Sequence, residues 1–131
     1  MKLVIQIPAW NEEEHLGAAL EALPDAVEGF DELEVVVVDD GSDDRTAEVA
    51  REHGATVVRL PVHRGLALAF ATGLRAALER GADVIVNTDA DNQYVAADIP
   101  ALVAPILAGD AQMVVGDRQV DRIRHFSPTK K

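Results

Sequence analysis

The chain has 131 residues, 48% of them hydrophobic, and no cysteine, so it can form one domain with a core but no disulfide or cysteine-bound zinc. Its 12 basic and 23 acidic residues give a net charge of −11, which argues against a nucleic-acid partner. In contrast to the rest of the chain, residues 118–131 have a net positive charge, with 5 basic side chains and 1 acidic one. No apolar stretch approaches the roughly 20 residues of a membrane span, and we expect a cytoplasmic protein.

Five apolar, β-branched runs predict strands at residues 3–7, 33–38, 56–60, 84–87 and 113–115. Runs that are apolar throughout are typical of parallel strands that are covered on both faces. Helices are predicted from Asn11, with Glu14 as capping-box partner, at 43–53, at 66–80 and from Asp98. In the third of these helices an apolar stripe is expected to face the core; it consists of Leu66, Phe70, Leu74, Ala77 and Leu78.

This alternation predicts an α/β fold, with a doubly wound, mainly parallel sheet and helices on both faces. Ligands of such sheets bind beyond the carboxyl ends of the strands. We therefore expect the functional residues in the loops that follow the strands.

Two carboxylates follow the fourth predicted strand, within the segment VIVNTDADNQY. Asp89 and Asp91 are two residues apart, so in an extended chain both side chains point to the same side. Carboxylate oxygens suit Mg²⁺ or Mn²⁺, which complete their coordination with water and substrate phosphates. The Asp-x-Asp pair therefore predicts a divalent metal site.

A second acidic pair, Asp39 and Asp40, ends the second predicted strand. A carboxylate there can accept hydrogen bonds from a ribose hydroxyl or a base N–H. Alternatively, Asp40, Ser42 and Asp43 merely cap the following helix. We favour capping for Ser42 and Asp43, and ligand contact for the acidic pair.

Two further loops offer candidate contacts. Trp10 could stack on or wall a nucleobase, or be a half-buried packing residue, and Glu12 is close enough to the loop to touch a ligand. Arg64 and Gly65 open the third predicted helix, where backbone N–H groups and a guanidinium could hold a phosphate or a base edge. The histidines show no metal-ligand spacing, and we interpret each as an ordinary residue: His15, His53, His63 and His125.

The segments IPAWNEEE, VVVVDDGSDDRT, RGLALAFATGLRAAL, DVIVNTDADNQY and VVGDR resemble, in this order, the amino-terminal half of inverting family 2 glycosyltransferases of the GT-A (Rossmann-like) fold. The DADNQ form and the later DIPALVAPIL are similar to polyprenyl-phosphate sugar transferases. The resemblance implies a transferase that uses Mg²⁺ or Mn²⁺ to move a sugar from a UDP- or GDP-linked donor to an acceptor such as a polyprenyl phosphate.

The resemblance also implies roles for individual residues. Asp89, Asp91 and Gln93 would handle the metal and the diphosphate, and Arg118 would face the sugar or the lipid phosphate. Asp91 and Arg118 are thus the catalytic candidates. The residues implied in nucleotide binding are Pro8, Ala9, Trp10, Glu12, Asp39, Asp40, Arg64, Gly65, Asp89 and Ala90.

Family 2 domains normally continue beyond this length with acceptor-binding elements. We therefore expect residues 1–117 to be a nucleotide-sugar-binding core and 118–131 a basic tail that begins a missing acceptor or membrane-facing region. Such a C-terminally truncated chain should fold, bind nucleotide, transfer sugar poorly and self-associate through its uncovered sheet edge.

Other readings stay open at this point. The chain could be a donor-binding module without turnover, which an assay for transfer would distinguish. A nucleotidyltransferase would have a glycine-rich, basic first loop where this chain has Trp-Asn-Glu-Glu-Glu. A receiver-type signalling domain would explain an acidic pair after a strand, but not Asp-Ala-Asp-Asn-Gln.

Overall fold

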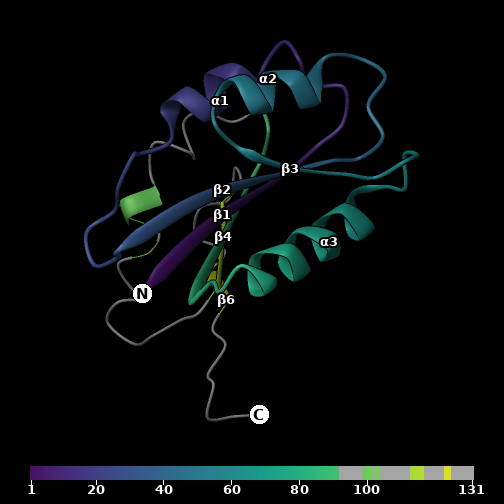
Figure 1. The fold of residues 1–131 in the computed structure, drawn as a ribbon. Coiled ribbons are helices and arrows are strands. Elements are labelled where there is room, and N and C mark those ends of the chain that lie inside the picture. The colour runs from purple at the N-terminus through teal and green to yellow at the C-terminus, as the bar shows by residue number, and fades with distance from the viewer. Residues whose placement is uncertain (92–98, 102, 104–112, 117–122, 125–131) are drawn as a thin grey trace.

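The computed structural model describes residues 1–91, 99–101, 103, 113–116 and 123–124. Its strands form one six-stranded sheet in the order β3-β2-β1-β4-β5-β6 (Figure 1). All neighbours from β3 to β5 are parallel, whereas β6 is antiparallel to β5. The strands are β1 (Lys2–Ala9), β2 (Glu32–Asp39), β3 (Thr56–Arg59), β4 (Val84–Thr88), β5 (Met113–Gly116) and β6 (Ile123–Arg124).

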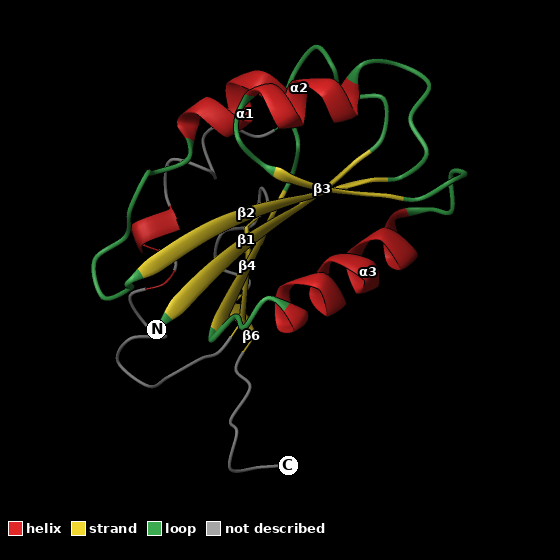
Figure 2. Ribbon diagram, viewed as in Figure 1, coloured by secondary structure: helices red, strands yellow, loops and turns green. Residues whose placement is uncertain are grey.

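The helices cover both faces of the sheet, as Figure 2 shows: α1 (Leu16–Ala22) and α2 (Thr46–Glu52) lie on one face and α3 (Leu66–Glu79) on the other. The predicted doubly wound, mainly parallel α/β fold is confirmed, and each predicted strand is present. Strand β6 was not predicted, and it lies in the basic segment that we expected to be a tail. Within the described residues no helix is long and apolar enough to span a membrane.

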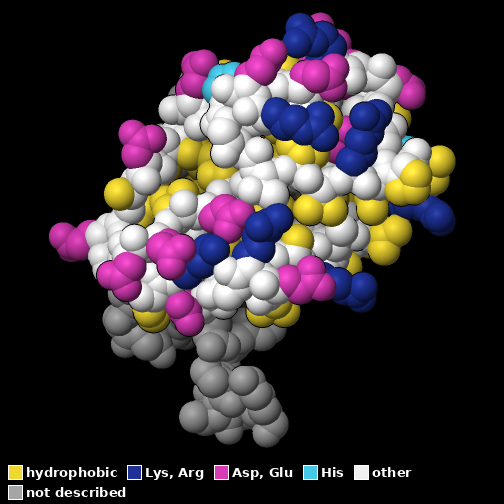
Figure 3. Space-filling view, viewed as in Figure 1, with side chains coloured by type: hydrophobic (Ala, Val, Ile, Leu, Met, Phe, Trp, Pro, Cys, Tyr) yellow, Lys and Arg dark blue, Asp and Glu magenta, His cyan; other side chains and the backbone are white. Residues whose placement is uncertain are grey.

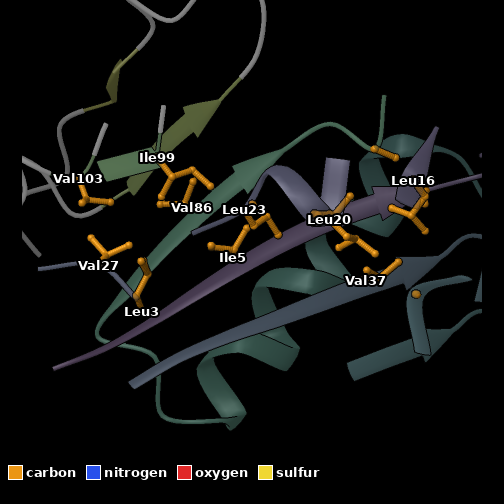
Figure 4. Close-up of a cluster of buried hydrophobic side chains, with 14 of the residues drawn as sticks. Leu3, Ile5, Leu16, Leu20, Leu23, Val27, Val37, Val86, Ile99 and Val103 are labelled. Carbon is orange, nitrogen blue, oxygen red and sulfur yellow. The ribbon is translucent and has the colours of Figure 1, made fainter. Parts of the chain in front are cut away.

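The larger part of the core lies between the sheet and the α1–α2 layer. Leu3 and Ile5 of β1 are fully buried and share a cluster with Leu16 and Leu20 of α1 (Figure 4). Alternate residues of β1 point to the opposite face, where Val4 joins the cluster beneath α3. Because β1 is central and covered on both faces, its run from Leu3 to Ile7 is almost entirely apolar.

The buried face of α3 differs from the predicted stripe. Leu66 and Leu78 are 72% and 65% exposed, so their assignment to the core was wrong. The buried residues are small: Ala69, Gly73, Ala76 and Ala77. Small residues let the helix approach the sheet closely, and a Cβ atom added at Gly73 would overlap the side chain of Gln6.

The predicted helix starts also need correction. Helix α1 begins at Leu16, and no capping box forms at Asn11, which has a positive φ of 51°. The Asn11 side chain instead accepts a hydrogen bond from Asp43 N at 2.9 Å, so it ties two loops together. Helix α2 begins at Thr46, three residues later than predicted, because this loop precedes it. Most of the helix predicted from Asp98 lies outside the described residues. Its described part, residues 99–101 and 103, is helical.

Candidate nucleotide and metal site

The carboxyl ends of β1, β2 and β3 meet at one edge of the sheet. Ala9 of β1 pairs with Asp39 of β2, which in turn pairs with Arg59 of β3. Asp40 N donates to the Ala9 carbonyl at 2.9 Å, which holds the loop after β2 against the loop after β1. Parallel register thus brings together side chains that are far apart in the sequence.

Asp40 fixes the segment that leads into α3. Its Oδ1 accepts a hydrogen bond from Arg64 N at 2.8 Å, and its Oδ2 accepts one from Gly65 N at 2.9 Å. His63 Nδ1 also lies 2.9 Å from Oδ2. Gly41 allows the close approach, because a Cβ there would come within 2.3 Å of His63 N. The two backbone N–H groups that we expected to hold a phosphate therefore donate to a carboxylate of the chain itself.

Asp39 has a different environment, although it is the neighbour of Asp40. It is 1% exposed, and its Oδ1 accepts a hydrogen bond from Ser42 N at 3.0 Å. Its Oδ2 lies 3.5 Å from Arg59 Nε, outside hydrogen-bond geometry. Arg59 also donates to the Ser42 carbonyl at 3.2 Å. Asp39 therefore organises the turn after β2.

A cavity of about 180 Å³ opens beside Asp40. One wall is formed by Trp10 and His63, whose rings stack with centroids 4.2 Å apart and planes at 24°. Trp10 is 46% exposed and lines the cavity. The residues that line the cavity are Pro8, Ala9, Trp10, Asp40, His63, Leu66 and Ala69.

Sequence reasoning missed His63, because no spacing linked it to Trp10 or Asp40. The one available signal was its position directly before Arg64 and Gly65, at the start of a predicted helix beyond a strand. The structure adds the contact that matters, since the ring touches both the carboxylate and the indole.

The loop after β1 is held by side chains of the loop after β2. Asn11 N donates to Ser42 Oγ and Glu12 N to Thr46 Oγ1, both at 2.9 Å. Ser42 therefore joins two loops, and capping of α2 was the wrong reading for it. Asp44 accepts hydrogen bonds from Thr46, and these keep its pKa low although burial acts in the opposite direction. These hydrogen bonds between the two loops set the position of Trp10 and Glu12 at the mouth of the site.

An acidic group lies at the carboxyl ends of β1 and β4. Burial, followed by the charge of Asp91, raises the pKa of Glu12, and the charge of Asp89 adds to the effect. Asp89 is partly buried and Asp91 exposed. In the part of the chain that the structure describes, no three His, Asp or Glu side chains converge on a single point suited to a metal. A cation here would be held by two carboxylates and completed by water and phosphate oxygens.

The sequence of residues 4–129 matches the family described as glycosyl transferase family 2. This chain belongs to glycosyltransferase family 2. The predicted family and the GT-A fold are thus confirmed.

Several relatives of this family 2 chain have named activities, and two of them are mannosyltransferases. The undecaprenyl-phosphate mannosyltransferase of Micrococcus luteus is 36% identical over 125 residues, which are 92% of this chain and 49% of that protein. The dolichol-phosphate mannosyltransferase of Pyrococcus furiosus is 36% identical over 124 residues, which are 92% of this chain and 34% of that protein. The chain thus spans half or less of the length of these relatives.

A solved structure gives a third comparison. Glucosyl-3-phosphoglycerate synthase from Mycobacterium tuberculosis, in complex with Mn²⁺, UDP-glucose and phosphoglyceric acid, superposes with a TM-score of 0.64 at 30% identity. The superposition covers 83% of this chain and 40% of that one. Two predicted site residues of the family 2 chain, Gln93 and Arg118, lie outside the described residues.

Proposed function

We propose that this chain is the donor-binding part of a metal-dependent, inverting glycosyltransferase that moves a sugar from a UDP- or GDP-linked donor to a polyprenyl phosphate. One observation carries the proposal: a small cavity between Trp10, His63 and Asp40 lies at the same sheet edge as the carboxylates of Asp89 and Asp91. A base and a diphosphate of one nucleotide would need these two environments side by side.

The cavity suits the base rather than the whole donor. Its volume of about 180 Å³ is below the roughly 300–1,000 Å³ typical of sites that enclose a complete drug-sized ligand. Pro8, Ala9 and Leu66 give it apolar surface, and Trp10 gives it an aromatic wall. Apolar and aromatic walls with two polar side chains, those of Asp40 and His63, suit a nucleobase, with the ribose and phosphates extending outward.

Asp39 would support nucleotide binding indirectly, whereas Arg64 would contact the nucleotide directly. Asp39 supports nucleotide binding by holding the turn after β2, since its carboxylate is turned toward Ser42 and Arg59. The exposed side chain of Arg64 is free to face a phosphate, whereas its backbone N–H is bound to Asp40. Gly65, with φ 103°, directs the chain into α3 behind it.

The acidic group fits a divalent cation. Hard carboxylate oxygens are the preferred ligands of Mg²⁺ and Mn²⁺. The pKa of Glu12 is raised first by burial and then by the neighbouring charge of Asp91. Asp89 and Asp91 would hold the cation, with Gln93 and the adjacent Ala90 backbone at the diphosphate. A bound cation would neutralise charge that develops on the leaving diphosphate. The chain itself would orient the donor, and Arg118 would face the sugar or the acceptor phosphate.

The choice of acceptor is supported by the relatives. Two of them are named for transfer to undecaprenyl and dolichol phosphates, and the solved neighbour holds phosphoglyceric acid. All three of these molecules carry a phosphate group, and the two lipid phosphates favour a polyprenyl phosphate as the acceptor of this chain. A phosphate oxygen is already ionised near neutral pH and needs no general base of this chain. We place the reaction at the cytoplasmic face of a membrane.

Binding of nucleoside diphosphates with and without Mn²⁺ tests the donor site. UDP or GDP at about 100 times its Kd should raise the free energy of unfolding by about 2.7 kcal/mol when the metal is present. Equal binding in EDTA and in Mn²⁺ would contradict the metal-dependent site. Transfer of radiolabelled sugar to a polyprenyl phosphate then separates an enzyme from a donor-binding module, and light scattering tests self-association.

A further inference from the structure

The carboxylate of Asp40 is already occupied within the protein. It accepts hydrogen bonds from Arg64 N and Gly65 N, and His63 Nδ1 lies 2.9 Å from its Oδ2. A carboxylate offers about four acceptor positions, and two of them are used by these hydrogen bonds while the imidazole lies against the carboxylate before any ligand arrives. Asp40 is also 3% exposed, which leaves little of it open to a base.

The same contact fixes the tautomer of His63. Nδ1 donates a hydrogen bond to the main-chain carbonyl oxygen of Asp40 at 3.3 Å and lies 2.9 Å from Asp40 Oδ2. Because both of these oxygens can only accept hydrogen bonds, Nδ1 carries the proton. In the neutral ring, the second nitrogen, Nε2, then has a free lone pair on the distal edge of the imidazole. The Asp40–His63 pair thus converts a buried carboxylate into a hydrogen-bond acceptor on a more exposed ring.

Trp10 fixes the plane of that ring. The indole and the imidazole stack at 4.2 Å and 24°, so rotation of the His63 side chain would lose both this contact and the one with Asp40. The His63 side chain is 47% exposed and lines the cavity, whereas that of Asp40 is 4% exposed. Of the two residues, His63 has the polar edge that a ligand can reach.

We propose that His63 is the residue that selects the nucleobase, and that Asp40 is a positioning residue that acts through it; the inference rests on the proposed nucleotide site. The Nε2 lone pair is complementary to the ring N–H of uracil or guanine. Cytosine has a lone pair at the matching ring nitrogen, which would face the lone pair of Nε2. The pocket should therefore accept UDP and GDP and discriminate against CDP.

Two substitutions separate the nitrogens of the ring. His63→Asn keeps an N–H group near the position of Nδ1, facing Asp40, but removes the acceptor at Nε2. His63→Gln reaches the position of Nε2 but presents an amide that can turn to donate or accept. His53→Asn, in α2's C-terminal cap and away from the cavity, is the matched control.

Isothermal titration calorimetry of the full chain with UDP, GDP and CDP in Mn²⁺ gives the readout. We expect wild type to prefer UDP over CDP by about tenfold, which corresponds to one hydrogen bond with a well-placed acceptor. His63→Asn and His63→Gln should bring the ratio close to one, whereas His53→Asn should leave it unchanged. Nitrogen-15 NMR should show the Nδ1–H tautomer in wild type and a smaller share of it in Asp40→Asn, which loses the carboxylate but keeps the main-chain carbonyl.

The outcomes separate this inference from the function on which it rests. If no nucleoside diphosphate binds to wild type, the donor site itself is wrong. If UDP binds and the UDP-to-CDP ratio survives in His63→Asn, the donor site stands and His63 does not select the base. A proton found on Nε2 alone in the free protein would overturn the proposed role of Asp40.

Discussion

The amino ends and the carboxyl ends of the parallel strands differ in how their acidic side chains are paired. At the amino ends of β1 and β2, Lys2 Nζ lies 2.9 Å from Glu34 Oε1, and Arg80 NH1 lies 3.2 Å from Glu34 Oε2. Burial tends to raise the pKa of Glu34, but hydrogen bonds from Lys2 and Thr56 lower it. Figure 3 shows acidic and basic side chains next to one another at this end of the molecule.

At the carboxyl ends of β1 and β4, acidic side chains are close enough to influence one another electrostatically. Burial and the charges of Asp91 and Asp89 raise the pKa of Glu12 instead of lowering it. The carboxylates of Asp39 and Asp40 accept hydrogen bonds from backbone N–H groups. The guanidinium of Arg59 lies beside the first carboxylate and the imidazole of His63 beside the second. At the amino ends of the strands, ion pairs with basic side chains balance the acidic charge and favour stability. At the carboxyl ends, part of the negative charge has no such partner, and a bound cation would balance it.

The largest effect is expected from Asp40→Ala, which removes the anchor of the segment before α3. Two backbone N–H groups would lose a charged acceptor, and we expect the free energy of unfolding to fall by about 3 kcal/mol. Denaturation by urea measures the change. Asp43→Ala, an exposed neighbour, should change stability by no more than about 0.5 kcal/mol. Equal losses in the two variants would show that the Asp40 contacts are unimportant.

A divalent metal should stabilise the chain only through the carboxylates at the carboxyl ends of the strands. Mn²⁺ at ten times its Kd should stabilise the chain by about 1.4 kcal/mol, and Asp91→Asn should remove most of this gain. A thermal-shift titration checks the result. Asp25→Asn removes an exposed carboxylate elsewhere and should keep the full gain. The same response to Mn²⁺ in both variants would rule out Asp91 as a ligand.

Glu34→Gln tests the paired edge. Losing the charged partner of Lys2 and Arg80 should cost about 1 kcal/mol near neutral pH. Because the folded-state pKa of Glu34 is lowered from 4.5, its contribution is present above that value and is lost as the pH falls through the folded pKa. Wild type and variant should thus converge in acid. Glu32→Gln is the control, since Glu32 is 70% exposed and lies 3.9 Å from Lys2 Nζ.

Glu12→Gln should give the smallest effect, with the opposite sign. The folded-state pKa of Glu12 is raised from 4.5, so folding favours the protonated form and stability falls as the pH rises through the folded pKa. The amide should therefore stabilise the metal-free chain by about 0.5 kcal/mol at pH 7, with no gain below pH 4. Thermal melts across this range measure it, with the exposed Glu13→Gln as control. A destabilised variant at pH 7 would mean that Glu12 is not under repulsion.

The sequence by itself determined the order of the elements, the fold class and the family. The apolar runs of β1 and β4 are buried on both faces, and that of β2 is buried from Val36 onward, so their composition alone identified them as parallel strands. The acidic residues at the ends of β2 and β4 could be assigned to one side of the sheet for the same reason, because parallel strands all have their carboxyl ends on that side.

Only the tertiary structure decided how individual side chains are used. Asp39 and Asp40 are adjacent in sequence, yet alternation in the strand turns one toward Arg59 and the other toward His63. The start of α1 depended on Asn11, whose side chain bonds to a loop 32 residues away rather than to its own helix. The stack of His63 on Trp10 joins residues from two loops, and no local pattern records such a contact. Periodicity reports which face of an element is apolar, but distances between loops are set by the register of the strands that carry them.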